Sequence, residues 1–361
     1  MTPEEIKRRI ILLIGARTYR DNAFVQAAER LGLQVIKGID LPKELADYYH
    51  PTLPLQFRDP DKAVAHLIAY GKSNPVSTII AVDDEATVIA ARACEELDII
   101  HNSPDAAYAA KNKFVMRQKL AAANVPGPHF RLFHTDDDPA LIGHEIDYPC
   151  VVKPILLSAS QGVIRANDPV EFVEAFNCTR AILLATGGEP GEAGKGHILV
   201  EEYIDGFEVA LEGIISHGRL KLLALFDKPD PLVGPYFEET IYTTPSRLPA
   251  KTQVEILETT KRACAALGLR EGPIHAELRV NDHGARVVEV AGRSIGGLCA
   301  KILRFGTEHI SLEELIIRQA MGMESDLPDR EEGAGGVMMI PIPARGILTA
   351  VEGLEEARAI A

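Results

Sequence analysis

The chain has 361 residues, of which 46% are hydrophobic and 25% are charged, and its formal net charge is −14 at pH 7. This length predicts two or three domains, and the absence of any apolar run near 18 residues argues against a membrane span. Five scattered cysteines without a Cys-x-x-Cys pair argue against zinc and against a disulfide framework, and the negative charge disfavours nucleic acid as the main partner. We therefore expect a cytoplasmic globular protein and leave small-molecule partners open.

The first 110 residues alternate apolar strands with amphipathic helices, as an open parallel sheet does. The expected strands are 9–15, 33–38 and 78–82, and the expected helices are 22–31, 60–70 and 87–97. Asp83 and Glu85 follow the last strand, at the sheet edge where open α/β sheets bind ligands. Acidic residues also cap helices, and we favour that role for both. Residues 15–20 lack the Gly-x-Gly-x-x-Gly spacing, so a dinucleotide site is disfavoured.

A second region begins with an expected helix at 111–120 and continues with a strand that ends at Lys153. The loop 157–163 comes next and is rich in Ser, Ala and Gly. Small residues let backbone N–H groups approach phosphate oxygens, and a neighbouring lysine supplies positive charge. Taken alone, the same residues also suit a solvent-seeking lysine and an ordinary turn.

The next expected strand, 197–203, carries Glu201 and Glu202 close to an Asp205-Gly206 turn. Glu208 follows that turn, where a carboxylate can accept hydrogen bonds from ribose hydroxyls. The backbone after Glu201 can meet an adenine edge. Exposed glutamates on an edge strand are the alternative interpretation.

The segment 275–293 reads as a hairpin with charged residues on one face. Strand alternation puts His275 and Glu277 on the same face, and residues 282–284 form an expected three-residue turn with Gly284 in the left-handed conformation. That register sets Glu277 opposite Glu289. Opposed carboxylates repel unless a cation lies between them, and hard oxygen ligands suit Mg²⁺. Two solvated glutamates on an exposed hairpin are the alternative.

In their order along the chain these segments resemble the ATP-grasp superfamily. The resemblance matches Lys113 and Lys153 to the ATP lysines, Ser158, Ser160 and Gly162 to the loop over the phosphates, Glu201, Glu202, Tyr203 and Ile204 to the adenine hinge, Glu208 to the ribose ligand, Glu277 and Glu289 to the magnesium ligands, and Arg293 to the arginine beside the transferred phosphoryl group. It implies ATP and Mg²⁺ as cofactors, with Mn²⁺ as a substitute.

The resemblance also implies an α/β fold, α+β in the ATP-binding half. We expect an N-terminal open parallel-sheet domain at 1–110, a small lid at 111–200 and a larger antiparallel-sheet catalytic domain at 201–361. One departure is Ala291, which replaces the asparagine of the family's Glu-x-Asn-x-Arg run. Similar runs occur in the branch that resembles L-amino-acid ligases and carnosine-synthase-type ligases. Residues 332–346 resemble the start of that branch's C-terminal subdomain, so a shortened chain or a fragment is expected, and its catalytic competence stays open.

The implied activity is ATP-dependent ligation of a carboxylate, expected to be an amino acid, to an amine through an acyl phosphate, with release of ADP and phosphate. His275, on the face of Glu277, and Lys228, in a proline-rich loop, are the substrate candidates. A structural histidine and a stiff connection are their alternatives. A purine-pathway ligase, a bicarbonate-using carboxylase and a non-catalytic ATP-binding protein are the rival functions. The identity of both substrates, the number of metal ions and a homodimer stay open.

Overall fold

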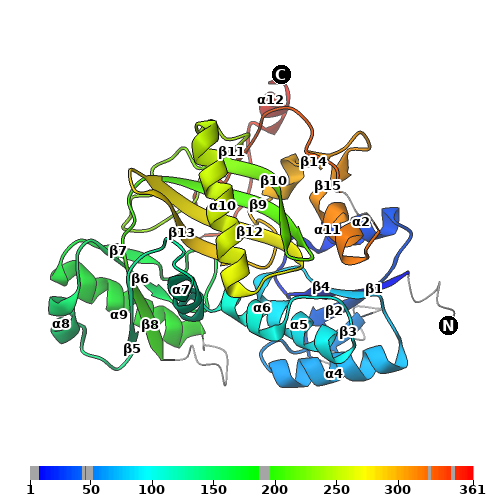
Figure 1. The fold of residues 1–361 in the computed structure, drawn as a ribbon, viewed down its shortest axis with the longest axis horizontal. Coiled ribbons are helices and arrows are strands. Elements are labelled where there is room, and N and C mark those ends of the chain that lie inside the picture. The colour runs from blue at the N-terminus through cyan, green and yellow to red at the C-terminus, as the bar shows by residue number, and fades with distance from the viewer. Residues whose placement is uncertain are drawn as a thin grey trace.

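The computed structural model describes residues 8–42, 45, 52–186, 196–323, 327–342 and 346–360. Within these ranges three units are arranged as the sequence predicts: a parallel-sheet N-terminal domain, a lid and a large antiparallel sheet. In Figure 1 the N-terminal domain (blue and cyan) and the lid (green) lie on opposite sides below the large sheet. The predicted fold class is confirmed. No described helix is long and apolar enough to cross a bilayer.

The N-terminal domain is a four-stranded parallel sheet in the order β3-β2-β1-β4. Its elements are β1 (Arg9–Ile14), α2 (Asp21–Arg30), β2 (Gln34–Asp40), β3 (Thr52–Leu55), α4 (Pro60–Ser73), β4 (Thr78–Ala81), the 3₁₀ turn η1 (Asp84–Ala86) and α5 (Thr87–Glu96). Strand β1 is apolar from Ile10 to Ile14, as expected for a parallel strand that is buried on both faces. Ile11 and Leu13 pack with α4 and α5, whereas Ile10 and Leu12 belong to a core shared with the large sheet. This shared core fixes the N-terminal domain against the large sheet.

Two short helices connect the N-terminal domain to the lid, α6 (Pro104–Lys111) and α7 (Lys113–Ala122). The sequence predicts one helix here, but it is divided at Asn112. The Asn112 side chain caps α7 by accepting hydrogen bonds from the backbone N–H groups of Phe114 (3.0 Å) and Val115 (3.1 Å). This cap places Lys113 at the first position of α7. Met116 and Leu120 pack into the core of the large sheet, and the domain boundaries drawn from the sequence stay a prediction.

The lid is a four-stranded antiparallel sheet in the order β5-β8-β6-β7. Its elements are β5 (Phe130–His134), α8 (Pro139–Ile142), η2 (Gly143–Glu145), β6 (Cys150–Pro154), β7 (Ile164–Ala166), α9 (Pro169–Thr186) and β8 (His197–Glu202). Phe172 and Phe176 of α9 pack on Val152 and Val200 of the sheet. Strands β6 and β8 are the two central strands, so they hold Lys153 and Glu201 on rigid backbone.

The large sheet has six strands in the order β13-β12-β9-β10-β11-β16. The elements of this unit are β9 (Phe207–Ser216), β10 (Arg219–Asp227), β11 (Ile241–Thr244), α10 (Ala250–Leu267), β12 (Gly272–Asn281), β13 (Gly284–Ala291), η3 (Cys299–Ile302), β14 (Arg304–Phe305), β15 (Ile310–Ser311), α11 (Leu312–Ala320), β16 (Gly335–Met338) and α12 (Leu354–Arg358). One face packs on α10, through Leu211 and Leu278, and the other packs on α11 through Ala210 and Phe226.

Candidate functional site

Two neighbouring cavities meet over the hairpin formed by β12 and β13. The lid cavity, of about 90 Å³, lies between the lid and the large sheet, and the domain cavity, of about 330 Å³, lies between the large sheet and the carboxyl ends of β1 and β4. Six residues line both cavities: Ser158, Ala159, Ser160, Glu239, Glu277 and Glu289. A ligand that fills the lid cavity therefore reaches the domain cavity at these glutamates.

The hairpin has the predicted opposition of glutamates but reaches it by a different route. Strand β12 ends at Asn281, which pairs with Gly284, so the predicted three-residue turn is wrong and the turn contains two residues. Gly284 has the expected positive φ, at +93°. A bulge at Val288 then shifts the register by one residue and brings Glu277 opposite Glu289. The carbonyl of Val288 accepts a hydrogen bond from Arg117 of α7, which satisfies the bulged backbone.

A first charge cluster, the Glu201 cluster, consists of Glu201, Arg117 and Lys153. Arg117 Nε donates to Glu201 Oε1 at 2.6 Å, and Lys153 Nζ lies 2.7 Å from Oε2. Burial opposes ionisation of Glu201, but the two cations outweigh it and lower its pKa to about 2. Burial lowers the pKa of Lys153. The cluster has two cations for one carboxylate, and Lys153 is thereby held at the wall of the lid cavity.

A second charge cluster, the Lys228 cluster, consists of Lys228, Glu208, Glu239 and Glu277. Lys228 Nζ lies 2.8 Å from one carboxylate oxygen of each glutamate, and it lies 5.0 Å from the centre of the Tyr242 ring. Burial opposes the charge on Lys228, yet the carboxylates raise its pKa well above the ordinary value. Burial and the charge of Glu277 raise the pKa of Glu239. Three carboxylates therefore converge on a point that already holds a cation.

The far end of the lid cavity is aromatic and flat. The Tyr203 ring stacks on Phe237 at a centroid distance of 6.4 Å, and the Arg165 and Arg279 guanidinium groups lie 4.0 and 5.0 Å from its centre. Arg279 Nε also donates to Glu208 Oε2 at 2.7 Å, which fixes the second oxygen of that carboxylate. Ile204 lines the same cavity. These groups make a surface that suits a planar ring beside a carboxylate.

The loop 157–163 and Lys113 lie between the two clusters. Lys113 Nζ donates to the carbonyl of Leu157 at 2.8 Å and lies 3.2 Å from Glu289 Oε1. Ser158 and Ser160 line both cavities, whereas Gly162 lies outside them. The Gly162 carbonyl instead accepts a hydrogen bond from Thr179 Oγ1 at 2.9 Å.

The domain cavity contains the remaining predicted residues. Arg293 Nε donates to Asp84 Oδ2 at 2.8 Å, and this carboxylate raises the pKa of Arg293 although burial opposes its charge. His275 Nδ1 lies 3.4 Å from Glu212 Oε2, and its Nε2 lies 3.6 Å from Glu277 Oε1. Burial would lower the pKa of His275, but both glutamates outweigh burial and raise it to about 9. His275 therefore carries a positive charge at neutral pH.

Sequence reasoning missed Arg117, Glu239 and Asp84, because none of them lies in a recognised motif. It also assigned Asp83 to helix capping, which is wrong. The Asp83 side chain makes no capping hydrogen bond and instead lies 3.5 Å from Arg20 Nη1, in the wall of the domain cavity. Glu202, expected at the hinge, pairs with Arg286 at 2.7 Å at the rim of the lid cavity.

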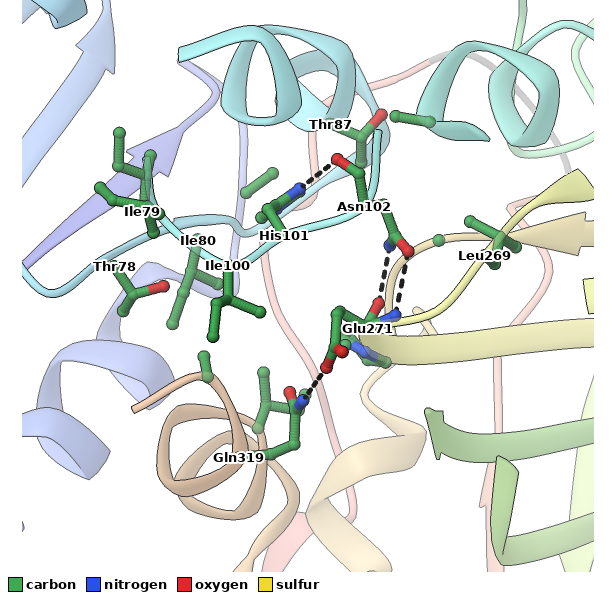
Figure 2. A pocket seen from close by; sticks show the side chains of 18 of the residues that line it. Thr78, Ile79, Ile80, Thr87, Ile100, His101, Asn102, Leu269, Glu271 and Gln319 are labelled. Carbon is green, nitrogen blue, oxygen red and sulfur yellow. Dashed lines mark hydrogen bonds between the residues drawn. The ribbon is translucent and has the colours of Figure 1, made fainter. Parts of the chain in front are cut away.

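A third cavity, which we name the rear cavity, has a volume of about 700 Å³ and shares Asp84 with the domain cavity. Figure 2 shows its aliphatic wall, including Ile80 and Ile100, and shows the polar groups bonded to one another. The Asn102 side chain donates to the Glu271 carbonyl at 2.7 Å, and Gln319 donates to the Glu271 carboxylate at 3.0 Å. Because these polar groups stabilise the junction of the domains, we place the chemistry in the two smaller cavities.

The fold and the paired cavities are those of an ATP-dependent enzyme class. Residues 146–302 match the family model of the ATP-grasp domain, and residues 25–99 match that of the ATP-grasp N-terminal domain. The chain belongs to the ATP-grasp superfamily.

The chain is similar over most of its length to two curated proteins and to one solved structure. The alanine–anticapsin ligase of Bacillus subtilis (strain 168) is 26% identical over 83% of this chain and 67% of its own length. Carnosine synthase 1 of Homo sapiens is 24% identical over 91% of this chain, which spans 42% of the human protein. The crystal structure of an L-amino acid ligase from Bacillus licheniformis superposes with a TM-score of 0.82, at 27% identity, and the match covers 98% of this chain and 86% of that one.

Proposed function

We propose that the chain is an ATP-dependent ligase that joins the carboxylate of an amino acid to an amine, with an acyl phosphate as intermediate and ADP and phosphate as products. The observation that carries this proposal is the meeting of the two cavities at Glu239, Glu277 and Glu289. A nucleotide in the lid cavity would end its phosphate chain where the domain cavity begins. The named ligase relatives support the same reaction class.

The lid cavity suits ATP in each of its parts. The Tyr203 and Ile204 segment would hold the adenine, and Glu208 would accept hydrogen bonds from the ribose. Lys153 and Lys113 lie on the way to the shared glutamates, where the phosphates would lie. The Glu201 cluster has one cation in excess, and a phosphate oxygen would complete its charge balance.

Magnesium suits the carboxylates of the Lys228 cluster, which line the lid cavity. Oxygen atoms of Glu208, Glu239 and Glu277 lie within 4.8 Å of one another, and the Lys228 ammonium already occupies the point on which they converge. Hard carboxylate oxygens are the ligands that Mg²⁺ prefers. Glu277 and Glu289 would hold the metal, and Glu239 would supply an oxygen in place of the asparagine that Ala291 replaces. The bound ion would neutralise charge on the transferred phosphoryl group.

The other steps depend on side chains of the domain cavity. Arg293 would hold the substrate carboxylate and the developing negative charge, while protonated His275 adds a second positive charge on the same side. Phosphoryl transfer depends mainly on such positioning and charge neutralisation. The loop at Ser158 and Ser160 would cover the acyl phosphate, since water would otherwise hydrolyse it before the amine attacks.

A screen of amino-acid pairs with Mg-ATP, with ADP release and product mass as readouts, tests this function. We expect Glu289→Gln and Arg293→Ala to lower the rate of ligation about 10²-fold or more, because each removes a preorganised charge at the transferred group. Glu258→Gln is the matched control, since Glu258 is exposed on α10 and pairs with the exposed Lys261 at 2.8 Å.

Full ligation by either site variant would show that the site assignment is wrong. ADP release that requires bicarbonate or a purine precursor, and no amino acid, would instead support the rival reactions of the superfamily. ATP binding without turnover on any pair would support the non-catalytic alternative.

A further inference from the structure

The loop that follows β13 is held by the N-terminal domain. Arg20 Nη1 donates to the Ser294 carbonyl at 3.3 Å, and its Nη2 donates to Ser294 Oγ. The Gly297 N–H donates to the Tyr19 hydroxyl at 2.6 Å. Tyr19 and Arg20 follow β1, and all of these contacts join residues more than 270 positions apart in the sequence. The backbone that follows Arg293 is therefore positioned by a different domain.

The Arg293 side chain is held in the same way, by Asp84. Asp84 begins η1, the 3₁₀ turn that follows β4, and its carboxylate accepts a hydrogen bond from Arg293 Nε at 2.8 Å. Burial opposes the ionisation of Asp84, but Arg293, Lys113 and Lys111 outweigh it and lower its pKa. Asp84 is therefore a carboxylate at neutral pH and a full partner for the guanidinium.

The bonds of Arg293 leave one edge of the guanidinium for a ligand. Nε donates to Asp84, and Nη1 donates to the Ser294 carbonyl at 3.0 Å. Among the residues that the structure describes, none accepts a hydrogen bond from Nη2, and Arg293 lines the domain cavity. A guanidinium is a rigid planar fork, so fixing Nε and Nη1 also fixes the direction of Nη2.

Asp84 also forms part of the wall between two cavities. It lines the domain cavity on one side and the rear cavity on the other. Gly292, the residue before Arg293, also lines the rear cavity, so about 700 Å³ of open space lies close to the ion pair. Arg293 itself lines only the domain cavity of these two, where the ion pair with Asp84 holds its guanidinium.

We propose that Asp84 is a positioning residue that aims Arg293 at the reacting carboxylate, so that the catalytic arrangement is complete only when the N-terminal domain is in place. This inference rests on the proposed ligase function. Asp84 acts through Arg293 and does not touch the substrate. Misplacement of a charged group by about 1 Å can cost on the order of 10²-fold in rate.

A double-mutant cycle on the full chain tests the inference. Asp84→Asn keeps the size of the side chain and removes its charge. We expect it to lower kcat for ligation roughly 10- to 100-fold while KM for ATP stays within about twofold, because the lid cavity is untouched. Asp84→Glu is expected to recover part of kcat. In the Arg293→Ala background, Asp84→Asn should have no further effect.

Asp61→Asn is the matched control, because Asp61 pairs with Arg92 at 2.8 Å on the exposed surface of the same domain. Thermal unfolding midpoints and ATP affinity of every variant are measured alongside. The inference would be overturned if the folded Asp84→Asn variant kept the kcat of the parent chain, or if the losses in kcat from Asp84→Asn and Arg293→Ala simply added in the double variant. In either case an active parent chain would still support the ligase function. An inactive parent chain on all amino-acid pairs would contradict the function and the inference together.

Discussion

The Glu201 cluster and the Lys228 cluster lie at the wall of one cavity and have opposite charge balance. In the Glu201 cluster, two cations, Arg117 and Lys153, contact a single carboxylate. In the Lys228 cluster, one ammonium contacts three carboxylates, of which Glu208 also pairs with Arg279. Both clusters are buried, where an uncompensated charge is expensive. A fold that needed only stability would balance each cluster internally. The two imbalances instead suit the two halves of a metal–nucleotide complex, an anionic phosphate chain and a divalent cation.

The largest expected effect on stability comes from removing the carboxylate of the Glu201 cluster. Glu201→Gln leaves Arg117 and Lys153 buried without a carboxylate, and Arg117 cannot lose its proton. We expect a loss of about 3–5 kcal/mol in the free energy of unfolding, measured by urea denaturation without nucleotide. Glu202→Gln is the control, since the side chain of Glu202 is 36% exposed and pairs with Arg286. Its expected cost is about 0–1 kcal/mol. Equal losses in both variants would contradict the structural role of Glu201.

A smaller effect on stability is expected from removing the ammonium of the Lys228 cluster. Lys228→Met removes the ammonium from three carboxylates, and we expect a loss of up to about 3 kcal/mol in EDTA, because a stranded carboxylate can take up a proton. Mg²⁺ should then raise the unfolding midpoint of the variant more than that of the parent chain, since binding to the folded state adds stability. Measurement by calorimetry with and without Mg²⁺ needs no substrate. An equal Mg²⁺ response in both chains would count against a cation site at this cluster.

The sequence predicts what depends on local pattern. The alternation along 275–280 correctly puts His275 and Glu277 on the cavity face and Ala276 and Leu278 on the face that packs on α10, and the order of elements predicts the three units. The opposition of Glu277 and Glu289 was predicted from a three-residue turn, but the structure combines a two-residue turn with a bulge at Val288. Pattern fixes which face a strand residue occupies. It does not reveal a bulge that depends on a hydrogen bond from Arg117.

The residues that sequence reasoning missed are joined to the site by long-range contacts. Asp84 meets Arg293 across 209 positions, and Arg117 meets Glu201 across 84. Glu239 lies in an irregular segment between β10 and β11, where no periodicity gives a direction to its side chain. Asp83 was misassigned for the same reason, since an acid before a helix suits a cap as well as a cavity wall. Such residues become visible only when the domains are placed together.

The last expected effect concerns the proton on His275, whose pKa reports the negative charge of the Lys228 cluster beside it. The pKa of His275 is about 9 in the folded chain against 6.5 for the ordinary imidazole, so the folded state holds the proton more tightly. This contribution to stability is fully present below pH 6.5 and is lost as pH rises through 9. Over this window the free energy of unfolding should fall by about 1.4 kcal/mol per pH unit from this group. In His275→Gln that slope should be absent.

Urea denaturation from pH 6 to pH 9.5 in EDTA measures the slope, and His283→Gln is the control because His283 is exposed in the hairpin turn. The control should keep the slope of the parent chain. In the Lys228→Met variant the pKa of His275 should rise further. Glu277 then has one cation fewer beside it and attracts the imidazolium more strongly. A slope in His275→Gln as steep as that of the parent chain would mean that the glutamates do not hold this proton, and the negative charge inferred for the Lys228 cluster would lose its support.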